Sequence, residues 1–285
     1  MVDIKNKNLI KKGKNNTFPF FINKKNTFYM INPATYGKQY EQQIRTKLKT
    51  IYTSIPTTAQ FGVGPDLTIP ANKPNNRGQS VLVEIKTSTG ADFGQKAITF
   101  DGSSWIPKSS SEELPEHASL YNYLFSTFDI SNKIQSSWGL PNNNLNAQDL
   151  QILIETKEIN KVLFYEKKYQ QATRGKNPFP EIELTRGSAI VDSIVSYYNS
   201  KGVYYIQIKG KGFYILGNDV KNLNGLLKIN IPKFEPSTAR LILRGKPSIS
   251  SRTYRPVITF KSSTISTSTF NLENLSFIQS LHNNF

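Results

Sequence analysis

Residues 80–87, SVLVEIKT, are the stretch that decides the fold of this chain. Their β-branched and apolar side chains are typical of a half-buried β-strand. Because alternate side chains of a strand point to opposite faces, Glu84 and Lys86 are neighbours on one face, while Val83 and Ile85 point to the other. The stretch therefore predicts a strand that carries a carboxylate and an ammonium group on the face opposite its apolar core residues.

A turn and a second short strand precede this stretch. Residues 60–70, QFGVGPDLTIP, contain a Gly-Pro pair that turns the chain, and Asp66 then opens a short apolar alternation. A polar loop, residues 71–79, joins the two strands. If they pair as a hairpin, Asp66 and Glu84 approach each other at one end of the sheet.

Residues 36–54 predict a helix upstream of both strands. Tyr40, Ile44 and Leu48 recur every four residues and form one apolar stripe. Glu41 lies immediately beside that stripe, so its side chain is expected to project from the edge of the buried face.

Two carboxylates a few ångströms apart repel each other unless a cation lies between them. A divalent ion that prefers oxygen ligands would satisfy Asp66 and Glu84, and the backbone carbonyl of Ile85 could add a further oxygen. Lys86 could hold and orient an attacking water and help to lower its pKa. These are the groups needed to hydrolyse a phosphodiester bond.

The ordered set of Glu41, Pro65-Asp66 and Glu84-Ile85-Lys86 resembles the PD-(D/E)XK nuclease superfamily, over roughly residues 36–105. The resemblance implies an α/β fold with a restriction-endonuclease-like mixed central β-sheet flanked by helices. The rest of the chain aligns with no particular family.

The resemblance also implies the role of each residue. Asp66 and Glu84 would bind Mg²⁺, with Mn²⁺ as a substitute, Lys86 would be the catalytic lysine, and Glu41 would support a metal or a water. In some members a glutamine follows the Glu-X-Lys strand, and Gln95 could fill that place. A bare Glu-X-Lys triplet is not diagnostic, so the alternative is a surface strand whose glutamate and lysine form a solvated ion pair.

The chain of 285 residues carries 36 Lys and Arg against 20 Asp and Glu, a net charge of +16. This excess favours a polyanionic partner, although AT-biased coding of a chain rich in Asn, Lys and Ile could also produce it. With no cysteine and only two histidines, the chain excludes thiol chemistry, zinc sites built on cysteine, and sites that need several imidazoles.

From residue 203 onward the pattern predicts β-rich C-terminal elements. The expected strands are 203–209, 213–216, 226–231, 240–243 and 257–261. Basic side chains along them predict a surface that contacts DNA, and the alternative is a solvated basic face that protects sheet edges. The predicted DNA-binding residues are Lys209, Lys211, Arg240, Arg244, Lys246, Arg252 and Arg255.

Together these features predict an N-terminal arm at 1–32, a nuclease core with helical insertions at 33–200, and a basic region packed on that core at 201–285. The expected activity is Mg²⁺-dependent cleavage of double-stranded DNA by a homodimer most like a type II restriction endonuclease. The chain has no Walker A sequence, signal peptide or long apolar run, so we expect no nucleotide cofactor, no membrane and a cytoplasmic location. The alternatives are a homing, phage, recombination or repair nuclease, a DNA-binding protein without catalysis, and a basic structural or assembly protein.

Overall fold

The computed structural model describes residues 20–22, 28–30, 33–56, 64–111, 113–138, 181–248 and 253–285. Of the predicted DNA-binding residues, Arg252 lies outside the described residues. Most of the predicted arm at 1–32 lies outside them too; the part described there is a two-stranded antiparallel ribbon, β1 (Phe20–Ile22) with β2 (Phe28–Met30).

A four-stranded mixed sheet is built around the deciding stretch, in the order β3-β4-β8-β9. Its strands are β3 (Leu67–Pro70), β4 (Ser80–Lys86), β8 (Tyr205–Ile208) and β9 (Gly212–Ile215). Strands β3 and β4 pair as the predicted antiparallel hairpin, while β4 and β8 run parallel. A one-turn 3-10 helix, η1 (Pro74–Asn76), lies in the loop of the hairpin.

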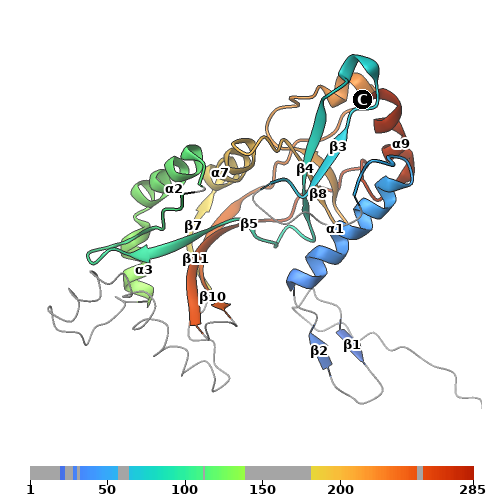
Figure 1. Cartoon of the computed structure of the whole chain (residues 1–285). Coiled ribbons are helices and arrows are strands. Elements are labelled where there is room, and N and C mark those ends of the chain that lie inside the picture. The colour runs from blue at the N-terminus through green and yellow to red at the C-terminus, as the bar shows by residue number, and fades with distance from the viewer. Residues whose placement is uncertain are drawn as a thin grey trace, which may run out of the picture.

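One face of this sheet is covered by α1 (Pro33–Lys49) and α9 (Leu275–Asn284), as Figure 1 shows. The predicted apolar stripe of α1 is confirmed, since Tyr40, Ile44 and Leu48 are each at most 1% exposed. They pack in one core with Val83 and Ile85 of β4. The alternation predicted for residues 80–87 is therefore the one that the fold uses.

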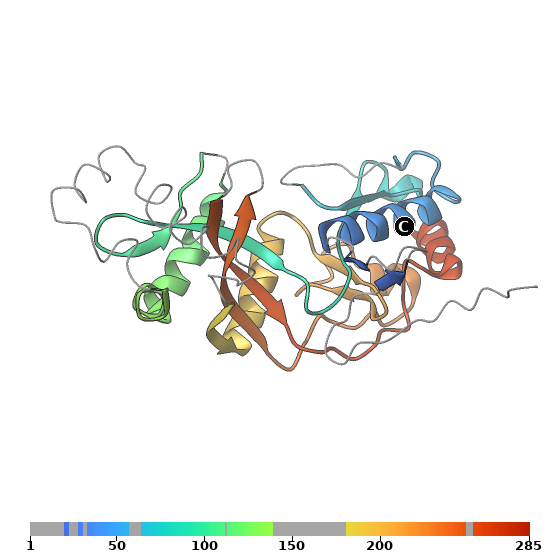
Figure 2. The same cartoon turned by 90° about the horizontal axis from the view of Figure 1, so that it is seen from below.

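A second sheet of five antiparallel strands has the order β6-β5-β11-β10-β7. Its strands are β5 (Phe93–Phe100), β6 (Trp105–Pro107), β7 (Ile182–Gly187), β10 (Ala239–Ser248) and β11 (Thr253–Ser262). The helices α2 (Pro115–Thr127), α3 (Ile130–Trp138) and α7 (Ser188–Asn199) lie beside it, apart from α1 and α9 in both views (Figure 2).

Helix α7 is central to the molecule because its core is shared by both sheets. Ile194 and Tyr198 of α7 belong to one apolar cluster with Phe260 of the five-stranded sheet and Ile206 of the four-stranded sheet. Each sheet also combines strands from either side of residue 200. The two sheets are thus held together by a continuous core that runs through α7.

One predicted strand is wrong: residues 226–231 are not extended, and the chain instead forms a short helix, α8 (Leu223–Leu227). The cause is a polar side chain outside the apolar run. The carboxylate of Asp219 accepts hydrogen bonds from the backbone N–H groups of Leu223 and Asn224 and so caps the first turn.

The molecule is a mixed α/β protein, as the sequence predicts at the level of fold class. Strands β10 and β11 are longer than expected, because they continue as a paired ribbon through Pro247 and Tyr254. Over the ranges that the structure describes, none of the helices combines the length and the apolar character needed to cross a bilayer.

Candidate functional site: an acidic centre at a sheet edge

The structure brings Asp66 and Glu84 to the same end of the four-stranded sheet, where β4 and β8 terminate, and we call this end the sheet edge. Asp66 immediately precedes β3, whose first residue, Leu67, pairs with Val83 of β4. Asp66 therefore lies beside Glu84 across the hairpin. Its Oδ2 accepts a hydrogen bond of 2.8 Å from the backbone N–H of Ile85, which fixes the carboxylate against β4.

The electrostatics of this edge show that the predicted acidic residues act on one another. Burial raises the pKa of Asp66 to about 7, and the negative charges of Glu84 and Glu41 add to the rise, while Lys86 opposes it. Burial also raises the pKa of Glu41, with Glu84 adding to that shift and Lys86 opposing it. Helix α1 thus places a third carboxylate within electrostatic reach of the hairpin.

Lys86 is paired with Glu84 in this structure. Its Nζ lies 2.6 Å from Glu84 Oε1, and the two side chains are only 15% and 12% exposed. Burial by itself would lower the pKa of Lys86, but the charge of Glu84, together with Tyr198 and Asp66, raises it well above the ordinary value. The lysine is therefore an ammonium group at neutral pH, suited to donate hydrogen bonds rather than to accept a proton.

Two aromatic rings hold the Lys86 side chain in place. Its Nζ lies 5.9 Å from the ring centroid of Phe93 and 5.8 Å from that of Tyr198. The Tyr198 hydroxyl also donates a hydrogen bond of 3.3 Å to Glu84 Oε1. Sequence reasoning missed this role, because Tyr198 lies on α7, more than one hundred residues after Glu84, and no local pattern links the two.

Arg45 is a second residue that sequence reasoning missed. It is 2% exposed, and its guanidinium donates a hydrogen bond to the backbone oxygen of Asp66. Its charge also lowers the pKa of Glu41. The available signal was spacing, since Arg45 lies four residues after Glu41 and so shares its side of α1.

The donor set at this edge fits a divalent ion that prefers oxygen ligands. Among the described residues, no group of three or more His, Cys, Asp or Glu side chains is arranged to hold a metal ion. The edge instead offers two side-chain carboxylates, Asp66 and Glu84, and the backbone oxygen of Ile85. Because burial and neighbouring negative charge disfavour ionised Asp66, a cation at this point would relieve the repulsion between the carboxylates.

In the described part of the chain, Gln95 forms no hydrogen bond with the acidic residues. It is on β5, opposite Thr259 of β11, and its Oε1 accepts a hydrogen bond of 3.0 Å from Lys246 of β10. Its described contact therefore joins it to the basic strands of the five-stranded sheet. The structure does not bring it into the contacts of Asp66, Glu84 and Lys86.

The predicted basic residues fall into two groups. Arg240, Arg244 and Lys246 share one face of β10, and Lys246 pairs in register with Arg255 of β11. Arg244 is bonded to Asp92 and Arg240 to Glu183, so part of this charge is compensated within the protein. Lys209 and Lys211 instead lie at the turn between β8 and β9, on the sheet that carries the acidic centre.

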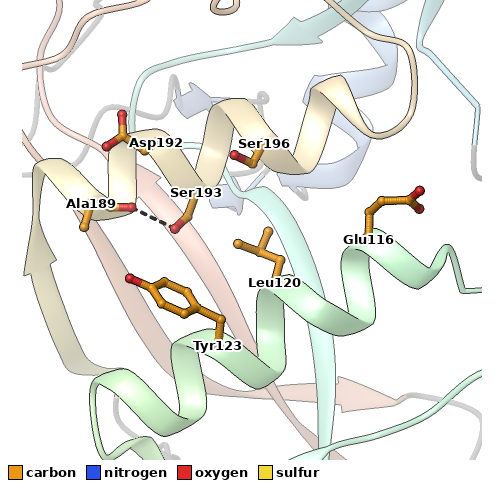
Figure 3. Close-up of a pocket in the computed structure, with 7 residues that line it drawn as sticks. All are labelled: Glu116, Leu120, Tyr123, Ala189, Asp192, Ser193 and Ser196. Atoms are coloured by element: carbon orange, nitrogen blue, oxygen red, sulfur yellow. Dashed lines mark hydrogen bonds between the residues drawn. The ribbon is translucent and has the colours of Figure 1, made fainter.

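A surface pocket of about 350 Å³ lies between α2 and α7, as Figure 3 shows. Leu120 and Tyr123 of α2 face Ala189 and Ser193 of α7 there, and the Ser193 hydroxyl is already bonded to the Ala189 carbonyl. None of the predicted site residues lines this pocket. The acidic centre, rather than the pocket, is therefore the candidate functional site.

Comparison with known proteins adds no relative: no family model, no curated protein and no solved structure matches this chain.

Proposed function

We propose that this chain is a metal-dependent endonuclease that hydrolyses phosphodiester bonds of double-stranded DNA. The observation that carries the proposal is the convergence of Glu41, Asp66, Glu84 and Lys86 at one sheet edge, each from the element that the resemblance requires. We further propose that the four-stranded sheet and α1 belong to a restriction-endonuclease-like fold of the PD-(D/E)XK superfamily. A type II restriction endonuclease acting as a homodimer is the member that we favour.

In this proposal, Asp66, Glu84 and the Ile85 carbonyl would hold Mg²⁺. The ion, when bound, supplies positive charge that polarises a phosphate and stabilises the charge developing on it. Glu41 supports the ion or a water from the α1 side.

Lys86 binds and orients the attacking water. The protonated Lys86 side chain can do this once its pairing with Glu84 is relaxed, because its Nζ then has hydrogen-bond donors to spare. The rings of Phe93 and Tyr198 keep the ammonium group in place during that exchange. The proposal therefore assigns Lys86 two states, paired with Glu84 in the metal-free protein and turned to water in the loaded one.

The DNA would be gripped by the basic face of β10 and β11. Arg240, Arg244 and Lys246 are on one face of a long paired ribbon, and an Arg fork can bind phosphate or a guanine edge. The bonds of Arg244 to Asp92 and of Arg240 to Glu183 would have to exchange for DNA contacts. We expect the affinity to fall steeply with salt.

The test is incubation of the protein with plasmid DNA in Mg²⁺, compared with the variants Lys86→Ala and Lys96→Ala. The second is a matched control, because Lys96 also forms a buried ion pair, with Glu113, and its side chain is 8% exposed. We expect the wild type and Lys96→Ala to cut and Lys86→Ala to lose at least about a thousandfold in rate. Intact plasmid with the wild type across many DNA sequences, or full cutting by Lys86→Ala, would contradict the proposal.

Mapping of the product ends distinguishes the kinds of nuclease. Defined ends at one short site support restriction, and nicks that depend on DNA structure support a repair or junction nuclease. Strong salt-dependent binding with no cleavage in any metal would point to a binding protein without catalysis.

A further inference from the structure

Lys209 lies at the same sheet edge as the acidic centre. Strands β4 and β8 run parallel, with Lys86 in register with Ile208, so both strands end together. The backbone N–H of Lys209 donates a hydrogen bond of 2.8 Å to the carbonyl of Lys86. Lys209, the first residue after β8, is thus hydrogen-bonded through its backbone to Lys86, the last residue of β4.

The Lys209 side chain is held by tyrosines rather than by a carboxylate. Its Nζ lies 4.5 Å from the ring centroid of Tyr36 and 5.2 Å from that of Tyr40, and it donates a hydrogen bond of 2.8 Å to the Tyr36 hydroxyl. Within the described part of the chain, no carboxylate forms an ion pair with Lys209. The ring faces fix the position of the ammonium group without neutralising its charge.

Lys209 and Lys86 approach the edge from opposite faces of the sheet. Residues 205, 207 and 209 alternate to the α1 face, where Gln207 donates to the Tyr40 hydroxyl. Lys86 projects to the other face, toward Phe93 and Tyr198. Two fixed positive charges therefore flank the strand ends, one on each side.

We propose that Lys209 is a second phosphate-binding group of the site, and that it holds a phosphate next to the scissile one on the same DNA strand. This inference rests on the proposed function, since it takes the phosphate at Asp66, Glu84 and Lys86 as the reference point. It separates Lys209 from the basic face of β10 and β11 and assigns it to the cutting centre. A lysine suits this role because it supplies point charge to a phosphate without reading a base.

The test measures binding rather than cutting. A short fluorescein-labelled duplex of mixed sequence is titrated with protein in Ca²⁺, and the dissociation constant is followed between about 50 and 200 mM salt. For Lys209→Ala we expect roughly three- to tenfold weaker binding. The salt slope, which is the slope of the logarithm of the binding constant against the logarithm of the salt concentration, should be smaller in size by about one unit, the amount expected for one lost phosphate contact. Lys209→Arg should keep the slope, because the arginine retains the positive charge at this position.

The matched control is Lys201→Ala. Lys201 also lies over a tyrosine ring, with its Nζ 4.7 Å from the centroid of Tyr197. It precedes β8, whereas Lys209 follows it, so the two lysines lie toward opposite ends of that strand. We expect this variant to keep the wild-type slope. Equal slopes for Lys209→Ala and Lys201→Ala would overturn the inference.

A second arm locates the phosphate. Once the cut site is mapped, single methylphosphonates, which lack the phosphate charge, are placed along the cut strand. The linkage beside the scissile one should weaken binding by the wild type but not further weaken binding by Lys209→Ala. Equal sensitivity of both proteins at that linkage would exclude the assignment.

The two arms also distinguish this inference from the proposed function. If the wild type never cuts DNA but the salt slope of Lys209→Ala is still lower, the proposed nuclease activity is wrong and Lys209 is a phosphate contact of a DNA-binding protein. If the wild type cuts DNA but Lys209→Ala keeps the wild-type salt slope, only the role proposed for Lys209 is wrong. A wild type that does not bind DNA overturns both.

Discussion

Replacing Asp66 with asparagine should stabilise the metal-free protein while removing its response to metal. The Asp66 carboxyl is held in a buried place beside Glu84 and Glu41, and its pKa is about 7 rather than near 4. Each pKa unit corresponds to about 1.4 kcal/mol, so ionised Asp66 costs the fold up to roughly 4 kcal/mol above pH 7. Asparagine removes that charge and keeps an oxygen that can accept from the Ile85 N–H.

The size of the effect should depend on pH. Because the folded protein holds the Asp66 proton more tightly than the unfolded chain, protonation contributes stability that is present below about pH 4 and lost as the pH rises to about 7. The pKa of about 7 already includes the attraction of Asp66 to Lys86, so we expect a net gain of up to about 4 kcal/mol at pH 8 and up to about 2 kcal/mol at pH 5.

The assay is urea unfolding followed by tryptophan fluorescence, for which the fully buried Trp105 is a suitable probe. In EDTA at pH 8, Asp66→Asn should unfold at higher urea than the wild type. In Ca²⁺ at ten times its dissociation constant the wild type should gain about 1.4 kcal/mol, and the variant should gain little. Asp192→Asn, which removes an exposed carboxylate on α7, should change stability by less than about 0.5 kcal/mol.

Two results would refute this reasoning. A variant less stable than the wild type in EDTA at pH 8 would mean that the Asp66 charge is compensated in the fold. Equal stabilisation of both proteins by Ca²⁺ would mean that the metal binds somewhere else.

Three further predictions follow from single contacts. Tyr198→Phe removes the hydroxyl bonded to Glu84 but keeps the ring beside Lys86, so the cleavage rate should fall roughly tenfold with an unchanged dissociation constant for DNA; unchanged rates would limit Tyr198 to the core. Gly212→Ala should cost more than about 2 kcal/mol in thermal unfolding, because φ is +105° and an added Cβ would lie 2.5 Å from a backbone oxygen. Asp219→Ala should cost about 2 kcal/mol in urea unfolding by uncapping α8, and a loss below about 0.5 kcal/mol would show that the cap is unimportant.

The parts of the site that could be predicted from sequence are those that local periodicity determines. The four-residue spacing of the α1 stripe and the two-residue alternation of β4 both depend on neighbouring side chains, and both occur as expected. The hairpin that joins Asp66 to Glu84 follows from a short polar loop between two apolar runs. The hairpin and the alternation of β4 place Asp66, Glu84 and Lys86 without knowledge of distant parts of the chain.

The remaining parts depend on contacts between distant segments. The parallel pairing of β4 with β8 brings Lys209 to the edge, and α7 brings Tyr198, yet no local pattern links either residue to Glu84. Gln95 was placed by analogy alone, and its hydrogen bond to Lys246 joins strands that are distant in sequence. The strand predicted at 226–231 failed because a cap outside the apolar run decides the local structure.

The parallel pairing of β4 and β8 affects how the protein is made. Ile208 is synthesised 122 residues after Lys86, the residue with which it pairs. At ribosomal rates of about 5–20 residues per second, roughly 6–24 s pass between the synthesis of Lys86 and that of Ile208. During this interval the hairpin that carries Asp66 and Glu84 has been synthesised, but β8 has not. A nascent chain therefore carries the acidic residues without the strand and aromatic side chains that order them. In the proposed nuclease, cleavage activity would arise only after residue 208 has been translated, so shorter nascent chains would not cut the cell's nucleic acid.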